Sequence, residues 1–324
     1  MHSIKASNVN TAYVSGLYWL RVAGIEEQSR NGRVVVAPEP VCTTYLRPWQ
    51  RVLFSAERDA NPFFHLMEAL WMMAGRQCVE WPSYFAKQLL EYSDNGITLA
   101  GAYGYRWREY FGYDQITEIV NILKDDPLSR RAVMSMWDGF TEESPKDKPC
   151  NTHIYFDCRG GVLNMTVCCR SNDAVWGTYG ANVVHMSVLQ EVMAAGIGIP
   201  IGQYRQMSNN FHAYPDTNNI AKLIEHPSSP DYYKTLGLKH YPLVDLEAGN
   251  MADWLVDAGN FTNNPTANED DSYVHPFFRE VAYPMYMAWH SRKNGETNGL
   301  EWVDQIEAVD WQIACTEWIQ RRMA

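Results

Sequence analysis

Residues 149–171, PCNTHIYFDCRGGVLNMTVCCRS, are the stretch from which the fold is best predicted. Residues 153–158 are apolar and aromatic, the Arg-Gly-Gly at 159–161 favours a turn, and 162–169 suit the partner strand of a hairpin. Cys150 stands immediately before the first of these strands, so its thiol is expected at the mouth of a sheet.

Helix signals flank this hairpin on both sides. Asn61-Pro62 sets a capping residue before a proline at the first helical position, which predicts a helix running to Gly75. Asp114 opens a second helix that ends before Pro127, and residues 182–195 are apolar enough for a buried third. The pattern also predicts strands at 132–137 and 203–207, an amphipathic helix from about 300 to 321, and polar loops at 141–148 and 260–271.

Strand pairs mixed with helices indicate an α+β fold in which a mixed β-sheet packs against helices. The sequence contains no stretch typical of a linker, a repeat or low complexity. Residues 1–324 are therefore expected to form a single domain with a helix-rich C-terminal segment. Of these 324 residues, 46% are hydrophobic, which is enough for a large core.

Charge and cysteine content argue against several classes of protein. The formal net charge of -11 disfavours a nucleic-acid partner, which requires a basic surface, whereas a few arginines suffice for one phosphate. The chain lacks both an apolar run of about 18 residues and a signal-peptide pattern. We therefore expect no membrane partner, and a location in the cytoplasm of a bacterium or of an infected cell. The 7 irregularly spaced cysteines indicate reduced thiols.

Cys150 is the candidate nucleophile. Lys146 and Lys148 precede it, and nearby cations stabilise a thiolate. The ordinary alternative for such a cysteine is a small buried hydrophobic residue. A zinc site with His153 and Cys158 is disfavoured, because the two have opposite strand parity and no paired CxxC spacing is present. We therefore expect no metal.

Arginines and one acid form a second group of candidates. Arg130-Arg131 lie between a predicted helix and a strand, and Arg170-Ser171 follow the strand at 162–169. A guanidinium fork with a neighbouring hydroxyl suits phosphate, although surface ion pairs explain most arginines. Glu68 lies in an otherwise apolar helix. Desolvation there would raise the pKa of its carboxyl toward the range of proton transfer, unless the side chain faces solvent.

Two polar loops complete the candidates, and ordinary loop polarity explains either of them equally well. Residues 208–214 carry amide, imidazole and phenol groups that suit sugar hydroxyls, with His212 and Tyr214 among them. The other loop combines an acid, an aromatic ring, a glycine and an amide, which suit a flat heterocycle: Asp173, Trp176, Gly177 and Asn182.

In their order along the chain, these pieces resemble the thymidylate synthase and deoxypyrimidine hydroxymethylase superfamily over about residues 30–214. The resemblance implies a homodimer that acts on a pyrimidine deoxynucleoside monophosphate, with 5,10-methylenetetrahydrofolate as cosubstrate and no metal. The matching residues are Glu68, Tyr103-Gly104, Arg130-Arg131, Pro149-Cys150, Arg170-Ser171-x-Asp173, Gly177, Asn182 and His212-x-Tyr214.

The resemblance also implies a covalent mechanism. Cys150 would add to C6 of the pyrimidine, which makes C5 a nucleophile toward the methylene carbon of the folate. Glu68 would organise water and move protons, and Tyr103 would belong to the water network. The residues expected beside the folate are Asp173, which also counts as catalytic, Trp176 and Gly177.

The contacts to the nucleotide are implied in the same way. Asn182 would face the base. The phosphate ligands would be Arg30, Arg170 and Ser171 from one subunit, with Arg130 and Arg131 supplied across the dimer interface. The contacts to the deoxyribose 3′-hydroxyl would be His212 and Tyr214.

Three departures from the synthase pattern bear on the product. Asn151 follows the cysteine where synthases carry histidine, residues 77–98 lack a Trp-Asp-Glu-Trp segment, and the chain ends in Arg-Arg-Met-Ala rather than in valine. Closing lids exclude water from a reactive intermediate. Their loss favours water capturing the C5 methylene, and hence a 5-hydroxymethyl product. Thymidylate synthesis from dUMP is the alternative.

The identity of the base depends on how the loop is counted. Counting back from Val188-Leu189 puts Asn182 at the base-reading position, whereas counting forward from Gly177 puts Ala181 there. An amide satisfies O4 and N3–H of uracil together, which favours dUMP, but dCMP stays open. A non-catalytic nucleotide- or RNA-binding relative is a third hypothesis, against which the retained Cys150 and the acidic charge count.

Overall fold

The centre of the molecule is a six-stranded mixed sheet. The computed structural model describes residues 1–29, 31–142, 145–217, 219–266 and 273–323. The strand order is β1-β4-β9-β7-β6-β5; β1 is parallel to β4, β7 is parallel to β9, and the other neighbours are antiparallel. The strands are β1 His2–Ala6, β4 Val41–Tyr45, β5 Val133–Ser135, β6 Asn151–Asp157, β7 Leu163–Cys169 and β9 Ile201–Ser208. The predicted hairpin at residues 153–169 is therefore confirmed as β6 and β7.

A second sheet of four short strands was not predicted. Its order is β2-β3-β10-β8, and β10 runs parallel to β8, so that His212 pairs with Asp173. Strands β8 and β10 have only two and three residues, too few for a periodic pattern, and the five-residue strands β2 and β3 show no clear alternation of buried and exposed residues. The four strands are β2 Ile25–Ser29, β3 Gly32–Val36, β8 Asn172–Asp173 and β10 Phe211–Ala213.

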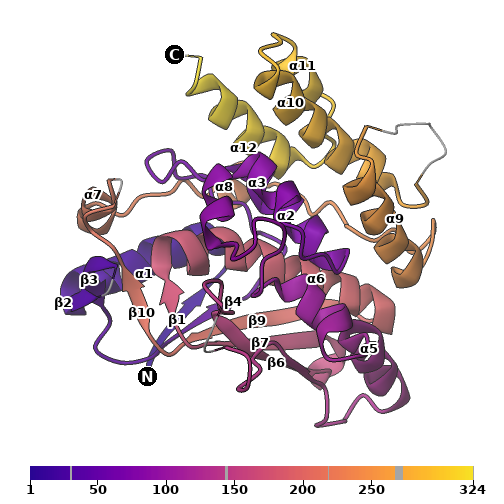
Figure 1. Cartoon of the computed structure of the whole chain (residues 1–324), viewed down its shortest axis with the longest axis horizontal. Helices are drawn as coiled ribbons and strands as arrows, with labels where there is room; N and C mark the ends of the chain where they lie inside the picture. Colours follow the sequence, from indigo (N-terminus) through magenta and orange to yellow (C-terminus); the bar gives the residue numbers. More distant parts are fainter. Residues whose placement is uncertain (30, 143–144, 218, 267–272, 324) are drawn as a thin grey trace.

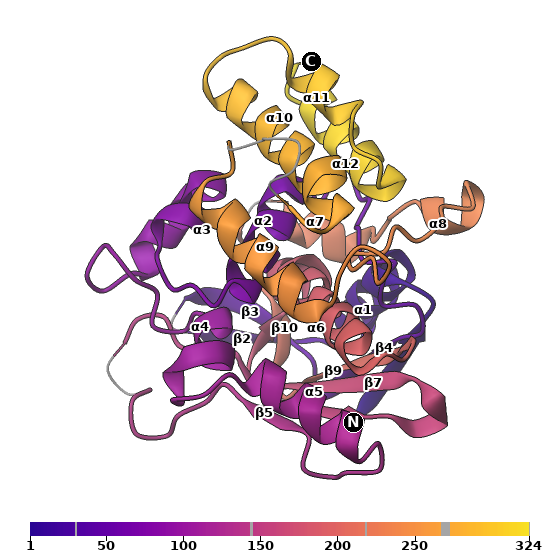
Figure 2. The same ribbon diagram turned by 90° about the vertical axis from the view of Figure 1, so that its right-hand side faces the viewer.

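The helices gather on one side of the six-stranded sheet, as Figures 1 and 2 both show. The C-terminal helices pack over α2 and α6, farthest from the strands (Figure 1). The α-helices are α1 Val9–Ala23, α2 Pro62–Met73, α3 Glu80–Phe85, α4 Tyr103–Tyr105, α5 Gln115–Asp125, α6 Asn182–Ile197, α7 Ile220–Glu225, α8 Tyr232–Thr235, α9 Met251–Asn263, α10 Tyr283–Lys293, α11 Gly299–Val303 and α12 Val309–Gln320. Short 3-10 or π-helical segments are η1 Lys87–Tyr92, η2 Arg106–Tyr110, η3 Arg159–Gly161, η4 Ala174–Ala181 and η5 Phe278–Ala282.

Local capping chemistry explains where the predicted helices begin. The Asn61 side chain accepts the Phe64 N–H at 3.1 Å, with a proline at the first helical position of α2. Asp114 caps α5 in the same way. Helix α6 is buried on all sides over most of its length because it lies between the sheet and α2.

Two predictions about the C-terminal segment were wrong. The expected helix at 300–321 is two helices, α11 and α12, because the chain turns between them and the Glu307 N–H bonds to the Glu280 carbonyl at 3.0 Å. The expected loop at 260–271 begins later, since α9 continues to Asn263, and residues 267–272 lie outside the described residues. No helix in the described chain is long and apolar enough to cross a bilayer.

Candidate active site

Cys150 lies at the mouth of the sheet, directly before β6. The Tyr103 hydroxyl accepts the backbone N–H groups of Cys150 at 3.0 Å and of Asn151 at 3.1 Å. Burial raises the pKa of Tyr103 well above its ordinary value, so this hydroxyl stays protonated. Tyr103 therefore holds the backbone on which the thiol is carried.

Arg170 places a positive charge beside the sulfur. Its Nη2 lies 3.8 Å from Cys150 Sγ, and its Nε donates to the Pro149 carbonyl at 3.0 Å. The Arg170 backbone N–H also donates to the Cys150 carbonyl at 2.9 Å, because β6 and β7 are paired there. A guanidinium in this position favours the thiolate form of the cysteine. Ser171 follows on the same strand end.

A cavity of about 300 Å³ opens at this thiol. Four residues that the sequence singled out line it together: Glu68, Tyr103, Cys150 and Asn182. Glu68 is the one residue of α2 that is not buried, and its carboxylate side chain keeps 15% of its surface exposed. The structure thus brings the expected nucleophile, acid and base-reading amide to a single cavity.

The position of Asn182 follows from a π-helical turn. Segment η4 has i→i+5 hydrogen bonds and leads into α6 at Asn182. Such a turn accommodates one more residue than an α-helical turn. This extra residue is why counting forward from Gly177 gives Ala181 and counting back from Val188-Leu189 gives Asn182. Ala181 and Asn182 both line the cavity, and only Asn182 carries a hydrogen-bonding side chain. Its Nδ2 donates to Asn172 Oδ1 at 3.1 Å.

Gly177 makes room for this amide contact. A Cβ at Gly177 would lie 2.5 Å from Asn172 Oδ1, so a larger residue would displace the Asn172 side chain. Asp173 caps η4 by accepting the N–H groups of Val175 at 2.7 Å and Trp176 at 2.9 Å. Burial raises the pKa of Asp173 above its ordinary value.

Trp176 and the 208–214 segment do not line the cavity. The Trp176 ring is 40% exposed and stacks on the Arg58 guanidinium at 4.5 Å. His212 and Tyr214 meet edge to face at 5.1 Å, and His212 Nδ1 lies 2.7 Å from Asn210 Oδ1. Burial lowers the pKa of His212, which favours a neutral imidazole.

None of the described residues expected to bind the phosphate lines this cavity, and these include Arg170 and Ser171 beside Cys150. Arg130 and Arg131 are exposed on the loop between α5 and β5, and neither lines the cavity of its own chain. Arg30 lies outside the described residues.

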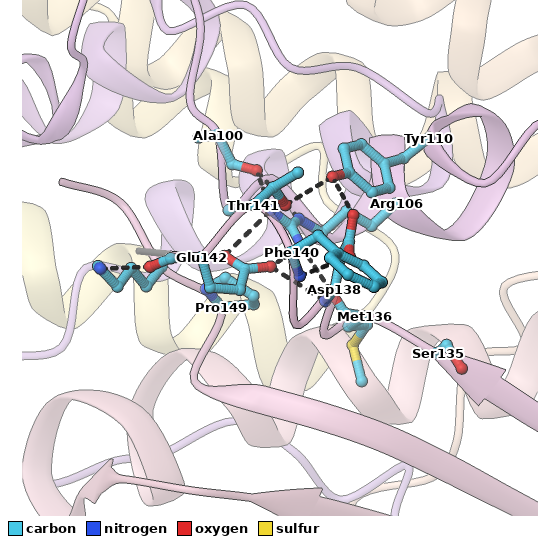
Figure 3. Close-up of polar contacts among 12 residues, drawn as sticks. Ala100, Arg106, Tyr110, Ser135, Met136, Asp138, Phe140, Thr141, Glu142 and Pro149 are labelled. Atoms are coloured by element: carbon cyan, nitrogen blue, oxygen red, sulfur yellow. Dashed lines mark hydrogen bonds and ion pairs between the residues drawn. The ribbon is translucent and has the colours of Figure 1, made fainter. Parts of the chain in front are cut away.

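A buried ion pair holds the loop that leads to Cys150. The Arg106 guanidinium binds the Glu142 carboxylate, and it also donates to the carbonyls of Ala100 at 3.0 Å and Met136 at 2.6 Å. Figure 3 shows Arg106 and Glu142 pointing toward each other, with Tyr110 beside them. The side chains of the pair are only 2% and 3% exposed, so the loop is anchored within the core.

Sequence reasoning missed two residues of the cavity. His185 lies one turn after Asn182 on α6, and its Nε2 is 3.0 Å from Glu68 Oε2. The i, i+3 spacing on a helix that starts at the site was the available signal. Asp147 lines the cavity too, and its Oδ2 accepts the Gly101 N–H at 2.8 Å. It was considered only as part of the charged stretch before the cysteine.

Among the residues that the structure describes, no cluster of three or more His, Cys, Asp or Glu side chains could hold a metal ion. The described part of the chain contains no disulfide bond.

Comparison with known proteins agrees with this geometry. The thymidylate synthase family model matches residues 59–253. A protein of Pseudomonas phage M6 named deoxyuridylate hydroxymethyltransferase is 44% identical over 340 aligned residues, which cover 100% of this chain and 95% of that protein. A protein of the same name from Bacillus phage SP01 is 33% identical, with 76% of this chain and 66% of that protein covered.

A solved structure supports the fold. The thymidylate synthase of T4 phage superimposes with a TM-score of 0.53 at 21% identity, covering 66% of this chain and 79% of that one. Together with the family model and the relative that matches the whole chain, this similarity shows that the chain belongs to the thymidylate synthase family.

Proposed function

We propose that the chain is a deoxyuridylate 5-hydroxymethylase that converts dUMP to its 5-hydroxymethyl derivative. The observation that carries the proposal is the 44% identity, over the whole chain, to a phage protein named for this activity. The thymidylate synthase of Symbiobacterium thermophilum is less similar, at 29% identity over 71% of the chain. The phage origin of the similar proteins named deoxyuridylate hydroxymethyltransferase supports action in the cytoplasm of an infected host.

The chemistry begins at Cys150. Its thiolate adds to C6 of the pyrimidine, and the C5 that this activates bonds to the one-carbon unit that 5,10-methylenetetrahydrofolate supplies. The Arg170 guanidinium, 3.8 Å from the sulfur, supports the thiolate. The presence of Cys150 and Glu68 in one cavity argues against a non-catalytic binding protein.

The base is read by Asn182. The amide oxygen and nitrogen each use one of their two hydrogen-bonding positions on protein partners, Asn151 and Asn172. One acceptor and one donor position remain. In the orientation that Asn151 and Asn172 impose they match N3–H and O4 of uracil, whereas N3 and the amine of cytosine would require the amide to be inverted. This supports dUMP over dCMP.

The folate fits the rim of the cavity. Trp176 is 40% exposed and lies with Gly177 on η4, which ends at the lining residue Ala181, so its ring offers a face for a flat pterin. Asp173 lies at the start of this turn. These residues bind and orient the cosubstrate.

A homodimer fits the sheet face that the helices leave uncovered. In β6 the side chain of Ile154 is buried toward the helices, whereas the neighbouring Tyr155 is 46% exposed on the opposite face. Pairing of two such faces buries this surface, and it lets Arg130 and Arg131 serve the phosphate of the partner's site.

Product analysis tests the proposal. The purified protein is incubated with 5,10-methylenetetrahydrofolate and either dUMP or dCMP, while mass spectrometry identifies the product and absorbance follows dihydrofolate. We expect a hydroxymethyl product from dUMP without a rise in dihydrofolate. A methyl product with that rise would identify a thymidylate synthase, and faster turnover of dCMP would overturn the assignment of the base.

A further inference from the structure

A second carboxylate lines the cavity at Cys150. Asp147 lines the same cavity as Cys150 and Glu68, on the loop three residues before the thiol. Its Oδ2 accepts the Gly101 N–H at 2.8 Å, and a Cβ at Gly101 would lie 3.0 Å from the carboxylate. The carboxylate therefore packs directly on the backbone at Gly101, in the wall of the cavity that Cys150 also lines.

The surroundings of Asp147 suit proton transfer. Burial raises the pKa of its carboxyl above the ordinary value, and the negative charges of Glu68 on α2 and Asp94 act in the same direction. The Gly101 N–H and the Arg106 guanidinium on η2 oppose this shift. The result is a carboxylate that is a stronger base than an exposed aspartate.

We propose that Asp147 is the general base that takes a proton from the water molecule that captures the exocyclic methylene carbon. This inference rests on the proposed hydroxymethylase function. A synthase must keep water away from that carbon, whereas a hydroxymethylase needs a water molecule held and deprotonated there.

The step balances without an oxidant or a reductant. The water oxygen forms a bond to the methylene carbon, and one water proton passes to Asp147. The electrons of the exocyclic double bond move into the ring, and the resulting enolate expels the Cys150 thiolate from C6, which restores the C5–C6 double bond. The products are the 5-hydroxymethyl nucleotide, a thiolate and a protonated Asp147.

Other groups in the cavity are less suited to this task. Glu68 Oε2 lies 3.0 Å from His185 Nε2, so that carboxylate already faces an imidazole. The Tyr103 hydroxyl accepts two backbone N–H groups and has a strongly raised pKa, so it does not act as a base. Asp147 meets the backbone of Gly101 through one oxygen, and its second oxygen is the one we assign to the water.

Comparing an early and a late step tests the inference. Tritium release from C5 of labelled dUMP reports the steps before water capture, and formation of the hydroxymethyl product reports capture itself. Asp147→Asn keeps the shape of the side chain and an oxygen for the Gly101 N–H. In a single turnover, with enzyme in excess over dUMP, we expect tritium release near the wild-type rate and product formation slowed about 100-fold or more. The exocyclic methylene intermediate should then accumulate, and a small thiol added to the assay should trap it as a thioether.

The control is Asp125→Asn, which removes an exposed acid at the end of α5 that neither lines the cavity nor acts on Asp147. It should retain both rates. Chemical rescue is the second measurement. Formate, a small carboxylate, should restore product formation when it is added to Asp147→Ala, whereas chloride should not.

The pH profile adds an independent readout. The base acts in its ionised form, so product formation in the wild type should fall as pH drops through the raised pKa of Asp147. That acidic limb should be absent from the residual activity of Asp147→Asn. Wild-type product formation by Asp147→Asn, or an equal loss of tritium release and product, would overturn the role of Asp147. A methyl product from the wild type would instead overturn the proposed function.

Discussion

Asn151 Nδ2 donates to Asn182 Oδ1 at 3.3 Å, so the residue after Cys150 orients the amide that we propose reads the nucleobase. The contact belongs to a chain of amides that all point the same way. Gln206 Nε2 donates to Asn151 Oδ1 at 3.2 Å. Asn182 Nδ2 in turn donates to Asn172 Oδ1, and Asn172 Nδ2 donates to the Ser208 hydroxyl at 3.0 Å. Inverting Asn182 would require the four amides to turn together.

Removing Asn151 should therefore weaken base selection while the thiol remains in place. For Asn151→Ala we expect the preference for dUMP over dCMP, measured as the ratio of kcat/KM values, to fall up to about tenfold, the worth of one net hydrogen bond. Thr152→Ala is the matched control, because its hydroxyl donates to the Cys168 carbonyl outside the cavity. Equal ratios for Asn151→Ala and wild type would show that the amide chain does not set the preference.

Asn182→Asp should reverse the preference. A carboxylate accepts hydrogen bonds but donates none, so it repels O4 of uracil and accepts from the exocyclic amine of cytosine. We expect kcat/KM for dUMP to drop about 100-fold or more, with dCMP becoming the better substrate. Steady-state assays with both nucleotides measure this. An unchanged preference would mean that another group, and not Asn182, reads the base.

The parts of this molecule that follow from local chemistry were predictable from its sequence. The Asn61 cap and the β6–β7 hairpin depend on neighbours within a few residues, and both were recognised. The break between α11 and α12 was not, because it depends on a contact of Glu307 with the distant Glu280. The apolar spacing alone is the same for one helix or two.

The site was predictable to a similar limit. Cys150, Glu68 and Asn182 were found through a resemblance, and the structure places them in one cavity. Asp147 and His185 have no motif of their own and became candidates only when the fold brought them there.

Breaking the buried ion pair beside the nucleophile loop should destabilise the protein. Glu142→Gln leaves the Arg106 guanidinium buried without a matching charge, and we expect the free energy of unfolding to fall by about 3–5 kcal/mol. Arg159→Ala is the control: its side chain, paired with Asp157, is 83% exposed, so the loss should stay within about 1 kcal/mol. Urea denaturation at one protein concentration compares the two. Equal losses would contradict a special role for the Arg106–Glu142 pair.

Shared sites predict complementation between inactive subunits. Cys150→Ala and Arg131→Ala should each abolish or strongly reduce turnover alone. In a mixed dimer, one site combines an intact thiol with the intact arginine of the other subunit. Random mixing should therefore restore about a quarter of wild-type activity. The measurement is turnover after joint unfolding and refolding. Activity no higher than that of the separate variants would show that Arg131 does not act across the interface.

The central claim is that Cys150 is the nucleophile. Tritium release from C5 of labelled dUMP is its most direct test. C5 loses its hydrogen only after a nucleophile has added to C6, so Cys150→Ala should release no tritium above background. Cys78→Ala is the matched control, because Cys78 is also half-buried but lines a different cavity, and it should release tritium as the wild type does. Release at the wild-type rate by Cys150→Ala would contradict the assignment of this thiol as the nucleophile.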